Sequence, residues 1–383
     1  MSASTEIPQQ MRAQFLDGFN KPYELRETSV PKISSPHDLL IKVGAASYCH
    51  TDHVLMSGEM QPNPPSFPHV GSHEFAGRIV AMHSESSEKA SAFKVGERLG
   101  VPGRAFHPCG SCFECSAGPE DSGYFYDDPP GYSVNCLKSG NNGISAPGGF
   151  REYAVVDARQ VTPLPDEMDE VNAAPLMCAG VTIYAALKRC NLKSGQRVGI
   201  MGCGGGLGHL GLQFAVAMGL KVLGVDAADK PLSLANVLGL DTRIVDARAE
   251  EAADIRKQLG KEDGKELLQE MGLDAVIILP ESQKAFDYGL ELLKNHGKLI
   301  LVSFPKGGFH LDSHAVVFRD ISITGSLVGS NRMLREMIEF AAKHKVKVSL
   351  KRYPLASLNK LVEDYLKAEG GKLVVDMSMQ DEQ

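Results

Sequence analysis

The stretch GIMGCGGGLGHLGLQ, residues 199–213, decides the fold of the middle of the chain. An apolar run ends at Gly202, a cluster of glycines follows, and a helical pattern then begins. The next apolar run, KVLGVDA, contains Asp226, 18 residues after Gly208. Glycines in such a turn let the backbone approach a pyrophosphate at the positive end of a helix. A carboxylate at the end of the second strand can bind both ribose hydroxyls and repel a 2′-phosphate. The stretch therefore predicts a dinucleotide-binding turn that favours NAD over NADP, and the alternative is a tight turn without a ligand.

The surrounding segments alternate between strand-like and helical patterns. The short apolar, β-branched runs lie at 196–202, 221–227, 242–247, 273–279, 298–304 and 321–327. Helical patterns, such as those at 231–239 and 283–295, fall between them. Alternation with short connections predicts an α/β fold built on a doubly wound parallel sheet.

The two ends of the chain differ from this middle part. Residues 1–175 are rich in Pro, Gly and short strands, and they predict an antiparallel, β-barrel-like domain. After about residue 330 come two helical patterns, at 332–345 and 357–368, and a strand at 372–377. Periodicity does not decide whether this last part joins the first domain.

Composition and charge exclude several classes of protein. A chain of 383 residues suits two domains rather than one compact core. The net charge is −7 and no basic stripe stands out, so nucleic acid is not an expected partner. The N-terminus has no apolar signal core, and no apolar run approaches the ~20 residues that span a bilayer. We expect no membrane association and a cytoplasmic, reducing environment, where the eight cysteines are thiols or metal ligands.

Three separated segments each offer one soft or borderline metal ligand. The segments are YCHTD (48–52), GSHEFAG (71–77) and PLMCAGVT (175–182). The ligands are Cys49, His73 and Cys178, and two thiolates with one imidazole leave a position open, as in a catalytic zinc site. Asp52 and Glu74 are natural partners for the ligands, because a carboxylate on the far imidazole nitrogen fixes its tautomer. Taken singly, each cysteine is more often a buried apolar filler, and it is the surrounding sequence that favours a metal ligand.

These segments follow one another in the order found in zinc-dependent medium-chain alcohol dehydrogenases, which the chain resembles over roughly residues 12–377, most closely in the microbial, yeast-like branch. The motifs that carry the resemblance are YCHTD, GSHEFAG, CGSCFEC, APLMCAGVTIYAAL, GCGGGLGHLGLQFAVAMG and LGVDA. The resemblance implies a GroES-like β-barrel catalytic domain with two zinc sites, formed by residues 1–175 and 330–383. It implies a Rossmann NAD-binding domain at 176–329.

The resemblance also implies roles for individual residues. Cys49, His73 and Cys178 would hold the catalytic zinc, which Glu74 would visit when water or substrate leaves. Thr51 would accept the proton of the alcohol, and Asp52 would support the ligands as the residues themselves suggest. The cofactor-binding positions would be His50, Gly202, Gly205, Gly206, Leu207, Gly208, Asp226, Lys230 and Lys372.

Three features depart from the family pattern. Many members carry a histidine where this chain has Val54, next to His53, so the proton relay either runs differently or ends at the ribose hydroxyl. The ethanol-specific members line their pocket with tryptophans, whereas this chain has none. Met60 stands at one of these positions and the segment GVPGRAF lacks the other, which predicts a roomier pocket. Lys372 replaces an arginine near the cofactor phosphates and cannot bind in a bidentate manner.

A second group of cysteines has the spacing C-x2-C-x2-C and a distant fourth member. These are Cys109, Cys112, Cys115 and Cys136. A ferredoxin-like iron–sulfur spacing would need its fourth cysteine where Pro119 stands, which excludes a cluster of that type. The family's structural zinc lobe would place it at Gly123, which cannot ligate. Cys136 lies fourteen residues before Phe150, as the family's fourth ligand does, so we expect a zinc site with four cysteine ligands; a lobe without metal is the alternative.

The residues added between Cys115 and Cys136 have the composition of an inserted surface loop. Loop lengthening costs only on the order of 1 kcal/mol of closure entropy, several times less than a structural zinc contributes. We expect Tyr124, Tyr126, Asp127 and Asp128 of this loop to face a neighbouring subunit or the mouth of the cleft.

The leading hypothesis is a zinc- and NAD(H)-dependent alcohol dehydrogenase or aldehyde reductase that acts on primary or aryl alcohols larger than ethanol. A second keeps the fold and the zinc but reduces a C=C or C=N bond. A third is a non-enzymatic zinc-binding module, which the acidic charge and the intact nucleotide turn disfavour. The apolar strands at 298–304 and 321–327 could lie near a subunit interface, and we expect a homotetramer or a homodimer.

Overall fold

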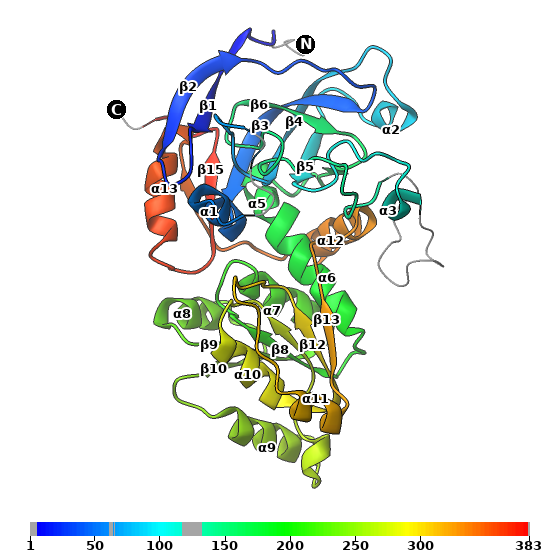
Figure 1. Cartoon of the computed structure of the whole chain (residues 1–383), viewed down its shortest axis with the longest axis vertical. Coiled ribbons are helices and arrows are strands. Elements are labelled where there is room, and N and C mark those ends of the chain that lie inside the picture. Colours follow the sequence, from blue (N-terminus) through cyan, green and yellow to red (C-terminus); the bar gives the residue numbers. More distant parts are fainter. Residues whose placement is uncertain (1–5, 61–63, 65, 117–131, 382–383) are drawn as a thin grey trace.

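The computed structural model describes residues 6–60, 64, 66–116 and 132–381, and these form two units (Figure 1). One unit holds a six-stranded sheet, and the other holds a seven-stranded sheet and a two-stranded one. The first and last parts of the chain both lie in the second of these units (Figure 1).

The six-stranded sheet is parallel throughout and confirms the doubly wound sheet that the sequence predicts. Its strands are β8 (Arg197–Met201), β9 (Lys221–Asp226), β10 (Thr242–Asp246), β11 (Leu273–Ile278), β12 (Leu293–Leu301) and β13 (Ser322–Gly325). They lie in the order β10-β9-β8-β11-β12-β13, so the chain reverses direction across the sheet between β8 and β11. In such sheets a ligand binds outside the carboxyl ends of the strands at this point of reversal.

Helices cover both faces of this sheet, and the strand residues divide between them. The helices are α6 (Val181–Cys190), α7 (Gly208–Ala217), α8 (Asp229–Val237), α9 (Ala252–Glu262), the short 3-10 helix η2 (Leu268–Glu270), α10 (Gln283–Leu292) and α11 (Ser313–Arg319). In β11, Ala275 and Ile277 join the core on the α6 and α7 face, whereas Val276 and Ile278 join the core with α9 and α10. The strand is therefore apolar on both faces, as its continuous apolar run predicts.

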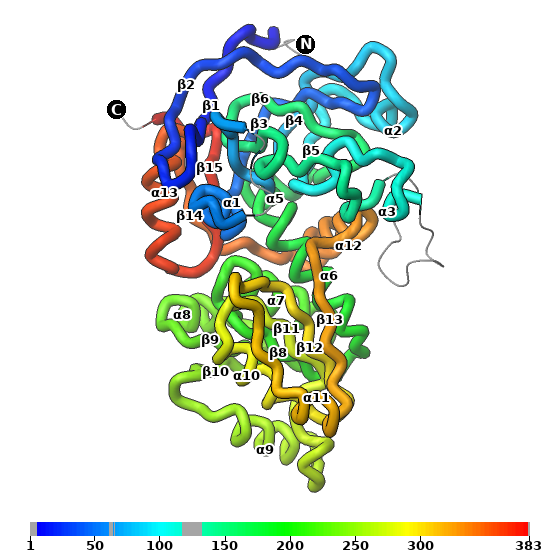
Figure 2. The backbone as a smooth tube through the Cα atoms, in the orientation of Figure 1, coloured from blue at the N-terminus to red at the C-terminus, as the bar shows by residue number. Residues whose placement is uncertain are grey.

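The larger sheet of the second unit is mostly antiparallel. Its strands are β3 (Asp38–Tyr48), β4 (Glu74–Met82), β5 (Arg98–Pro102), β6 (Tyr153–Asp157), β7 (Thr162–Pro163), β14 (Leu350–Tyr353) and β15 (Lys372–Asp376). They lie in the order β14-β15-β3-β4-β5-β7, with β6 also paired to β3, and a hairpin of β1 (Gln10–Leu16) and β2 (Tyr23–Ser29) lies beside them. β15 pairs antiparallel with β3, so the end of the chain returns to its beginning (Figure 2). The domain limits at 175/176 and 329/330 remain a proposal.

Most helices of this unit are short, and several were not evident from the sequence. They are α1 (His50–Ser57), α2 (Glu88–Ser91), α3 (Phe113–Ser116), α5 (Glu170–Pro175), the π-helical turn η1 (Leu176–Gly180), α12 (Asn331–Lys343), the 3-10 helix η3 (Leu355–Ser357) and α13 (Leu358–Tyr365). The ranges of α12 and α13 confirm the two helical patterns expected near the end of the chain.

The helical run from α5 through η1 to α6 corrects one expectation. It spans Glu170–Cys190, 21 residues, and by length and composition it is apolar enough to cross a membrane. The sequence alone predicts no apolar run of that size, because the ligand motif around Cys178 does not indicate that one helix spans the whole segment. In the structure 78% of its most apolar window is buried, and core helices of soluble proteins have the same composition. The run joins the two units (Figure 1).

Candidate functional site

A cavity of about 230 Å³ lies where the two units meet. The unit with the seven-stranded sheet lines it with Cys49 and His73, and the parallel sheet lines it with Leu279 and Val302. Leu279 directly follows β11, on the side where the sheet order reverses. The cavity therefore lies where a doubly wound sheet binds its ligand.

Three separate elements bring the predicted metal ligands to this cavity. Cys49 is the N-cap of α1, His73 directly precedes β4, and Cys178 lies in the π-helical turn η1. Such π turns within helices occur frequently at functional sites. Gly100 in β5 admits this turn, because a Cβ at that position would lie 2.2 Å from Met177 Sδ. Three separate backbone segments thus bring Cys49, His73 and Cys178 to the same side of the cavity.

The buried carboxylate of Asp52 connects two of these elements. Asp52 Oδ2 accepts a hydrogen bond from the Cys49 backbone N–H at 2.9 Å, and Oδ1 accepts one from the Ser72 N–H at 2.9 Å. Asp52 Oδ2 also lies 3.5 Å from His73 Nδ1. The carboxylate therefore sets the start of α1 against the start of β4, and it leaves His73 Nε2 as the nitrogen available to a metal.

The three side chains fit a metal ion. Their ligand atoms all lie within 4.8 Å of one another, and within the described structure neither ring nitrogen of His73 has a hydrogen-bond partner. A hydrogen bond from the Cys178 thiol lowers the pKa of Cys49 well below its usual value, against the effect of burial. Although burial alone would lower it, the charges of Asp52 and Cys49 raise the pKa of His73. The donor set of two cysteine sulfurs and one imidazole is that of a catalytic zinc site.

Glu74 lies beside the cluster but is engaged in a buried ion pair with Lys372. The other Glu74 oxygen accepts a hydrogen bond from the Ala179 N–H at 3.3 Å, and Lys372 Nζ donates to the Tyr48 carbonyl at 3.1 Å. Burial raises the pKa of Glu74 to about 7, although the ammonium opposes this. Burial alone would lower the pKa of Lys372, but Glu74 and Cys49 raise it above its usual value. The pair joins β4 to β15, so it ties the ligand region to the last strand of the chain.

The second cysteine cluster has the dimensions of a tetrahedral zinc site. Its four Sγ atoms lie within 4.8 Å of one another, and all eight cysteines of the chain are free of disulfides. Cys136 Sγ lies 3.8 Å from Cys112 Sγ and 3.7 Å from Cys109 Sγ. A zinc–sulfur bond of about 2.3 Å places the corners of a tetrahedron about 3.8 Å apart. The structure therefore brings Cys136 to the other three cysteines despite the long step in sequence.

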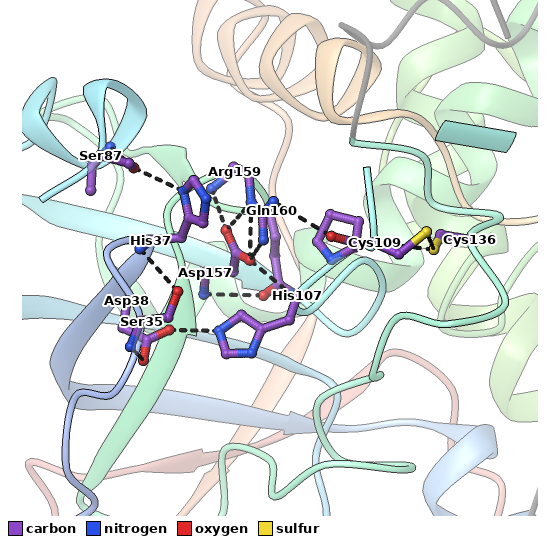
Figure 3. A network of polar contacts seen from close by, with 12 residues as sticks. Ser35, His37, Asp38, Ser87, His107, Cys109, Cys136, Asp157, Arg159 and Gln160 are labelled. Atoms are coloured by element: carbon purple, nitrogen blue, oxygen red, sulfur yellow. Dashed lines mark hydrogen bonds and ion pairs between the residues drawn. The ribbon is translucent and has the colours of Figure 1, made fainter. Parts of the chain in front are cut away.

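A polar network anchors this cysteine lobe to the sheet (Figure 3). His107 Nε2 lies 2.6 Å from Asp38 Oδ1, and the His107 N–H donates to Asp157 Oδ2 at 3.1 Å. Arg159 in turn donates to Asp157 Oδ2 at 2.6 Å, and both carboxylates are fully buried. Cys109 follows His107 by two residues, so the network fixes the first ligand of the lobe. Most of the expected insertion, including Tyr124, Tyr126, Asp127 and Asp128, lies outside the described residues.

The glycine turn after β8 has the close contacts of a nucleotide-binding turn. Gly202 has a φ of +79°, which side chains rarely adopt. A Cβ at Gly208 would lie 2.1 Å from the Gly202 carbonyl oxygen, so the helix start can approach the turn only without a side chain. Asp226 Oδ2 accepts a hydrogen bond from the Gly204 N–H at 3.1 Å, and Oδ1 accepts one from Ala227 at 2.8 Å. The turn and the acidic residue therefore lie together, as the sequence predicts.

A second cavity, of about 460 Å³, begins at this turn. Gly205 and Gly206 line it, and Cys49, His50 and Leu207 line both cavities, so the two are neighbours. Backbone N–H groups at the start of α7 give such a space the character of an anion site. Two adjoining cavities therefore lie beside the predicted metal ligands, one of them at the glycine turn.

The other predicted residues divide between these cavities. Thr51 lines the smaller one, and His53 lines the larger, where its Nδ1 has no hydrogen-bond partner within the described structure. His50 Nδ1 lies 2.8 Å from the Tyr365 hydroxyl, and its Nε2 lies 3.3 Å from Glu281 Oε1. The last contact crosses between the two units. Val54 brings no polar group to this region.

Both lysines predicted to bind the cofactor form ion pairs with acidic side chains in this structure. Lys230 Nζ pairs with Glu369 at 2.6 Å on the surface. Lys372 lines the larger cavity, but its ammonium group pairs with Glu74. Sequence reasoning missed the acidic partners of both lysines, and it also missed Glu281 and Arg104 in the cavity wall. These ion pairs join residues far apart in the chain, so no local pattern indicates them. The one sequence signal for a charged cavity wall is the arginine in GVPGRAF, Arg104.

Two family models match the chain. The first, described as alcohol dehydrogenase GroES-like domain, matches residues 35–166. The second, described as zinc-binding dehydrogenase, matches residues 206–343. Together they cover most of both units, although Cys178 and β8 lie between the two matched ranges and β14 and β15 follow the second.

Curated relatives and solved structures agree with these models. An alcohol dehydrogenase of Geobacillus stearothermophilus is 32% identical over 96% of this chain and 99% of its own length. Alcohol dehydrogenase 1 of Emericella nidulans is 32% identical over 97% of this chain and 99% of its own length. The crystal structure of the alcohol dehydrogenase of Aeropyrum pernix has a TM-score of 0.78 at 29% identity, covering 95% of this chain and 99% of that one.

The cysteine lobe predicts a second metal equivalent that depends on Cys136. We expect the purified protein to contain about two zinc ions per chain, because two clusters are assembled. Cys136→Ser should reduce this to about one, since three thiolates hold the ion less well than four. Elemental analysis after gel filtration measures it. Cys190→Ser is the matched control, because Cys190 is buried and donates to the Ala186 carbonyl, which serine can also do. Two ions in Cys136→Ser would contradict the assignment.

The buried pair of Glu74 and Lys372 predicts a characteristic stability pattern. Lys372→Met should lower the free energy of unfolding by about 3–5 kcal/mol, because it leaves a buried carboxylate unpaired. The double variant Lys372→Met with Glu74→Gln should recover most of this loss, since no uncompensated charge remains. Urea unfolding measures both. Lys351→Met, at a half-exposed lysine on β14, should cost less than about 1 kcal/mol, because its partner Asp364 keeps its ion pairs with Lys360 and Lys367. If the single and the double variant lose the same free energy of unfolding, the loss does not come from an unpaired Glu74 carboxylate.

Proposed function

Because the chain belongs to the zinc-binding medium-chain alcohol dehydrogenase family, we propose that it is a zinc- and NAD(H)-dependent alcohol dehydrogenase that acts on primary or aryl alcohols larger than ethanol. It would work in the reverse direction as an aldehyde reductase. The observation that carries this is the meeting of Cys49, His73 and Cys178 in a cavity adjoining the nucleotide turn. Membership of the microbial, yeast-like branch remains a prediction.

The metal-binding roles follow from the two clusters. Cys49, His73 and Cys178 would hold the catalytic zinc, and the four clustered cysteines of the lobe would hold a structural one. A catalytic zinc supplies a Lewis acid that favours the deprotonated form of an alcohol near neutral pH. Asp52 would orient His73 for this purpose. Glu74 would be restrained from the metal by its pair with Lys372.

Thr51 would take the proton of the alcohol. In support, Thr51 lines the cavity of the proposed metal ligands, whereas His53 lines only the neighbouring one. Val54 cannot pass the proton onward, because its side chain is a hydrocarbon. We therefore propose that the relay runs from Thr51 to the cofactor ribose and does not continue through a histidine at position 54. This makes Thr51 and the bound cofactor a single path for the proton.

NAD(H) is the cofactor that suits the acidic residue at the end of β9. Asp226 is held by the N–H groups of Gly204 and Ala227, so its carboxylate has a fixed place beside the turn. It would accept hydrogen bonds from both ribose hydroxyls and repel a 2′-phosphate. Lys230 and Lys372 are the cations near this path and His50 lies beside it, although each of the three has an acidic neighbour here.

The wall of the smaller cavity supports a substrate larger than ethanol. Met60 and Gly103 stand where bulkier residues would narrow it, and the chain contains no tryptophan. Ile144 and Leu334 make other parts of the wall apolar. An intact ligand set and a hydroxyl beside it favour alcohol oxidation over the reduction of a C=C or C=N bond.

The edge of the parallel sheet is the surface that we propose for self-association. Within the described sheet β13 pairs only with β12, and next to it in sequence α11 exposes Val317 and Phe318, which are 71% and 72% accessible. A strand edge with apolar side chains nearby is typical of a surface that pairs with another chain. We propose a homodimer or homotetramer, located in the cytoplasm as the free cysteines suggest.

Turnover is expected to depend on Cys49. Cys49→Ser should lower kcat/KM for alcohols by roughly 1,000-fold or more, because it removes a ligand of the ion that stabilises the alkoxide. NADH binding, followed by fluorescence, should persist because the glycine turn is unchanged. Cys190→Ser should retain activity. Full turnover of the wild-type protein after zinc removal, or turnover only on C=C or C=N substrates in a panel, would contradict the proposal.

Cofactor choice is expected to depend on Asp226. Asp226→Asn should lower kcat/KM for NAD roughly tenfold or more and raise it for NADP, because it removes charged hydrogen bonds to the ribose and the repulsion of a 2′-phosphate. Steady-state kinetics with each cofactor measures the ratio. Asp229→Asn is the control, since this carboxylate is 86% accessible and pairs with Arg248 nearby. A wild-type preference for NADP would overturn the assignment.

A further inference from the structure

Arg104 is a cation in the wall of the metal-site cavity that has no acidic partner among the described residues. Of the described residues that line this cavity, it is the only lysine or arginine, and Glu281 is the only acid. Glu281 lies 3.3 Å from His50 rather than beside Arg104. A guanidinium in an otherwise mostly apolar wall requires an explanation, because a cation removed from water needs acceptors.

The contacts of Arg104 leave most of its hydrogen-bonding capacity unused. Within the described structure its side chain makes one hydrogen bond, from Nη1 to the Val134 carbonyl at 3.2 Å, and no ion pair. A guanidinium carries five N–H donors. Burial lowers the pKa of Arg104 below its usual value, and only the nearby Cys178 opposes this. The fold therefore places a cation in the cavity without supplying an anion for it from the described part of the chain.

Other half-buried arginines show what a satisfied guanidinium looks like in this protein. Arg159 forms two short contacts with Asp157, at 2.6 and 2.9 Å. Arg197 binds Asp263 in the same way, at 2.6 and 2.8 Å. Arg151 also lacks an acid among the described residues, but it does not line the cavity. Arg104 thus differs from these three arginines, because it has no acidic partner among the described residues and also lines a cavity that a small molecule can enter.

Arg104 is close to the reacting end of the cavity. It follows Gly103, where a Cβ would lie 2.7 Å from the Cβ of His73. Its charge also acts on Cys178, a second proposed ligand. The cavity wall also includes Ile144 and Leu334, which offer no charge. A molecule that reaches the metal ligands with one end therefore has a single arginine available to its other polar group.

We infer that the substrate carries a carboxylate, which Arg104 binds, so that the enzyme acts on hydroxycarboxylates and the corresponding oxo acids. This inference rests on the proposed function and narrows its substrate class. A carboxylate matches the planar fork of a guanidinium and can accept two parallel hydrogen bonds from it. Hydride leaves the carbinol carbon for NAD and the hydroxyl proton leaves to the relay, so the carboxylate itself is unchanged. Arg104 is a substrate-binding, specificity-determining residue and takes no part in proton or hydride transfer.

The alternative role for Arg104 is to stabilise the Cys178 thiolate as a metal ligand. That role would affect every substrate equally and would lower the zinc content. A role in substrate binding would act on the KM of acidic substrates and leave the zinc content and uncharged substrates alone. The two roles therefore separate in measurements on matched substrates.

The test compares ω-hydroxycarboxylates of four to eight carbons with n-alkanols of the same chain length, using zinc-loaded wild-type enzyme and NAD. We expect the wild-type enzyme to have the higher kcat/KM for the acid of at least one pair. Arg104→Met should lower kcat/KM for the acid roughly 10- to 100-fold, mainly through KM, and change the alkanol by less than about threefold. Arg104→Lys should have a kcat/KM for the acid between those of the wild-type enzyme and Arg104→Met, because lysine keeps the charge but loses the bidentate geometry.

Three outcomes would overturn the inference. If the wild-type enzyme oxidises alkanols at least as well as the acids at every length, the substrate class is wrong while the proposed function stands. If Arg104→Met lowers kcat/KM equally for the acid and the alkanol, or lowers the zinc content, the role of Arg104 is to stabilise the Cys178 thiolate. If the wild-type enzyme oxidises neither series, nor any alcohol of a wider panel, the proposed function fails with it.

Discussion

The site depends on one buried carboxylate, that of Asp52. It accepts hydrogen bonds from the N–H groups of Cys49 and Ser72, and it faces Nδ1 of His73. A carboxylate at the start of a short helix also meets the positive end of the helix dipole. Because the same group caps α1 and fixes the approach to β4, it decides the distance between two metal ligands. The third ligand, Cys178, then needs only a turn of the central helical run to meet them.

The closure of the chain supplies the next constraint. β15 pairs with β3, so Lys372 comes to lie beside Tyr48 and against Glu74. One pairing of strands therefore joins the end of the chain to the ligand region. Lys372 also lines the nucleotide cavity, so a single buried ammonium lies between the two proposed sites. The acidic neighbour of the ligands and the cofactor path are thus electrostatically coupled through one residue.

The sequence was sufficient for the parts of this protein that are local. The strand and helix alternation, the glycine turn with Asp226 and the order of the ligand motifs each depend on neighbouring residues, and the structure reproduces their arrangement. Contacts between distant residues were not accessible. Lys372 with Glu74 and His50 with Glu281 join segments more than two hundred residues apart, and no periodicity encodes such pairs. The helical run at Glu170–Cys190 was missed because its ligand motif lies in a π turn rather than in a regular helix.

The charges of the site explain why Arg104 stands out. Two thiolates would balance a bound zinc ion, and Glu74 balances Lys372. The charge of Asp52 is distributed over two N–H groups and the neighbouring imidazole. Among the described charged residues at this site, Arg104 is the one whose partner is a single carbonyl. A site that satisfies its other charges within its own chain, yet leaves one cation facing a cavity, assigns the missing anion to the molecule that fills the cavity.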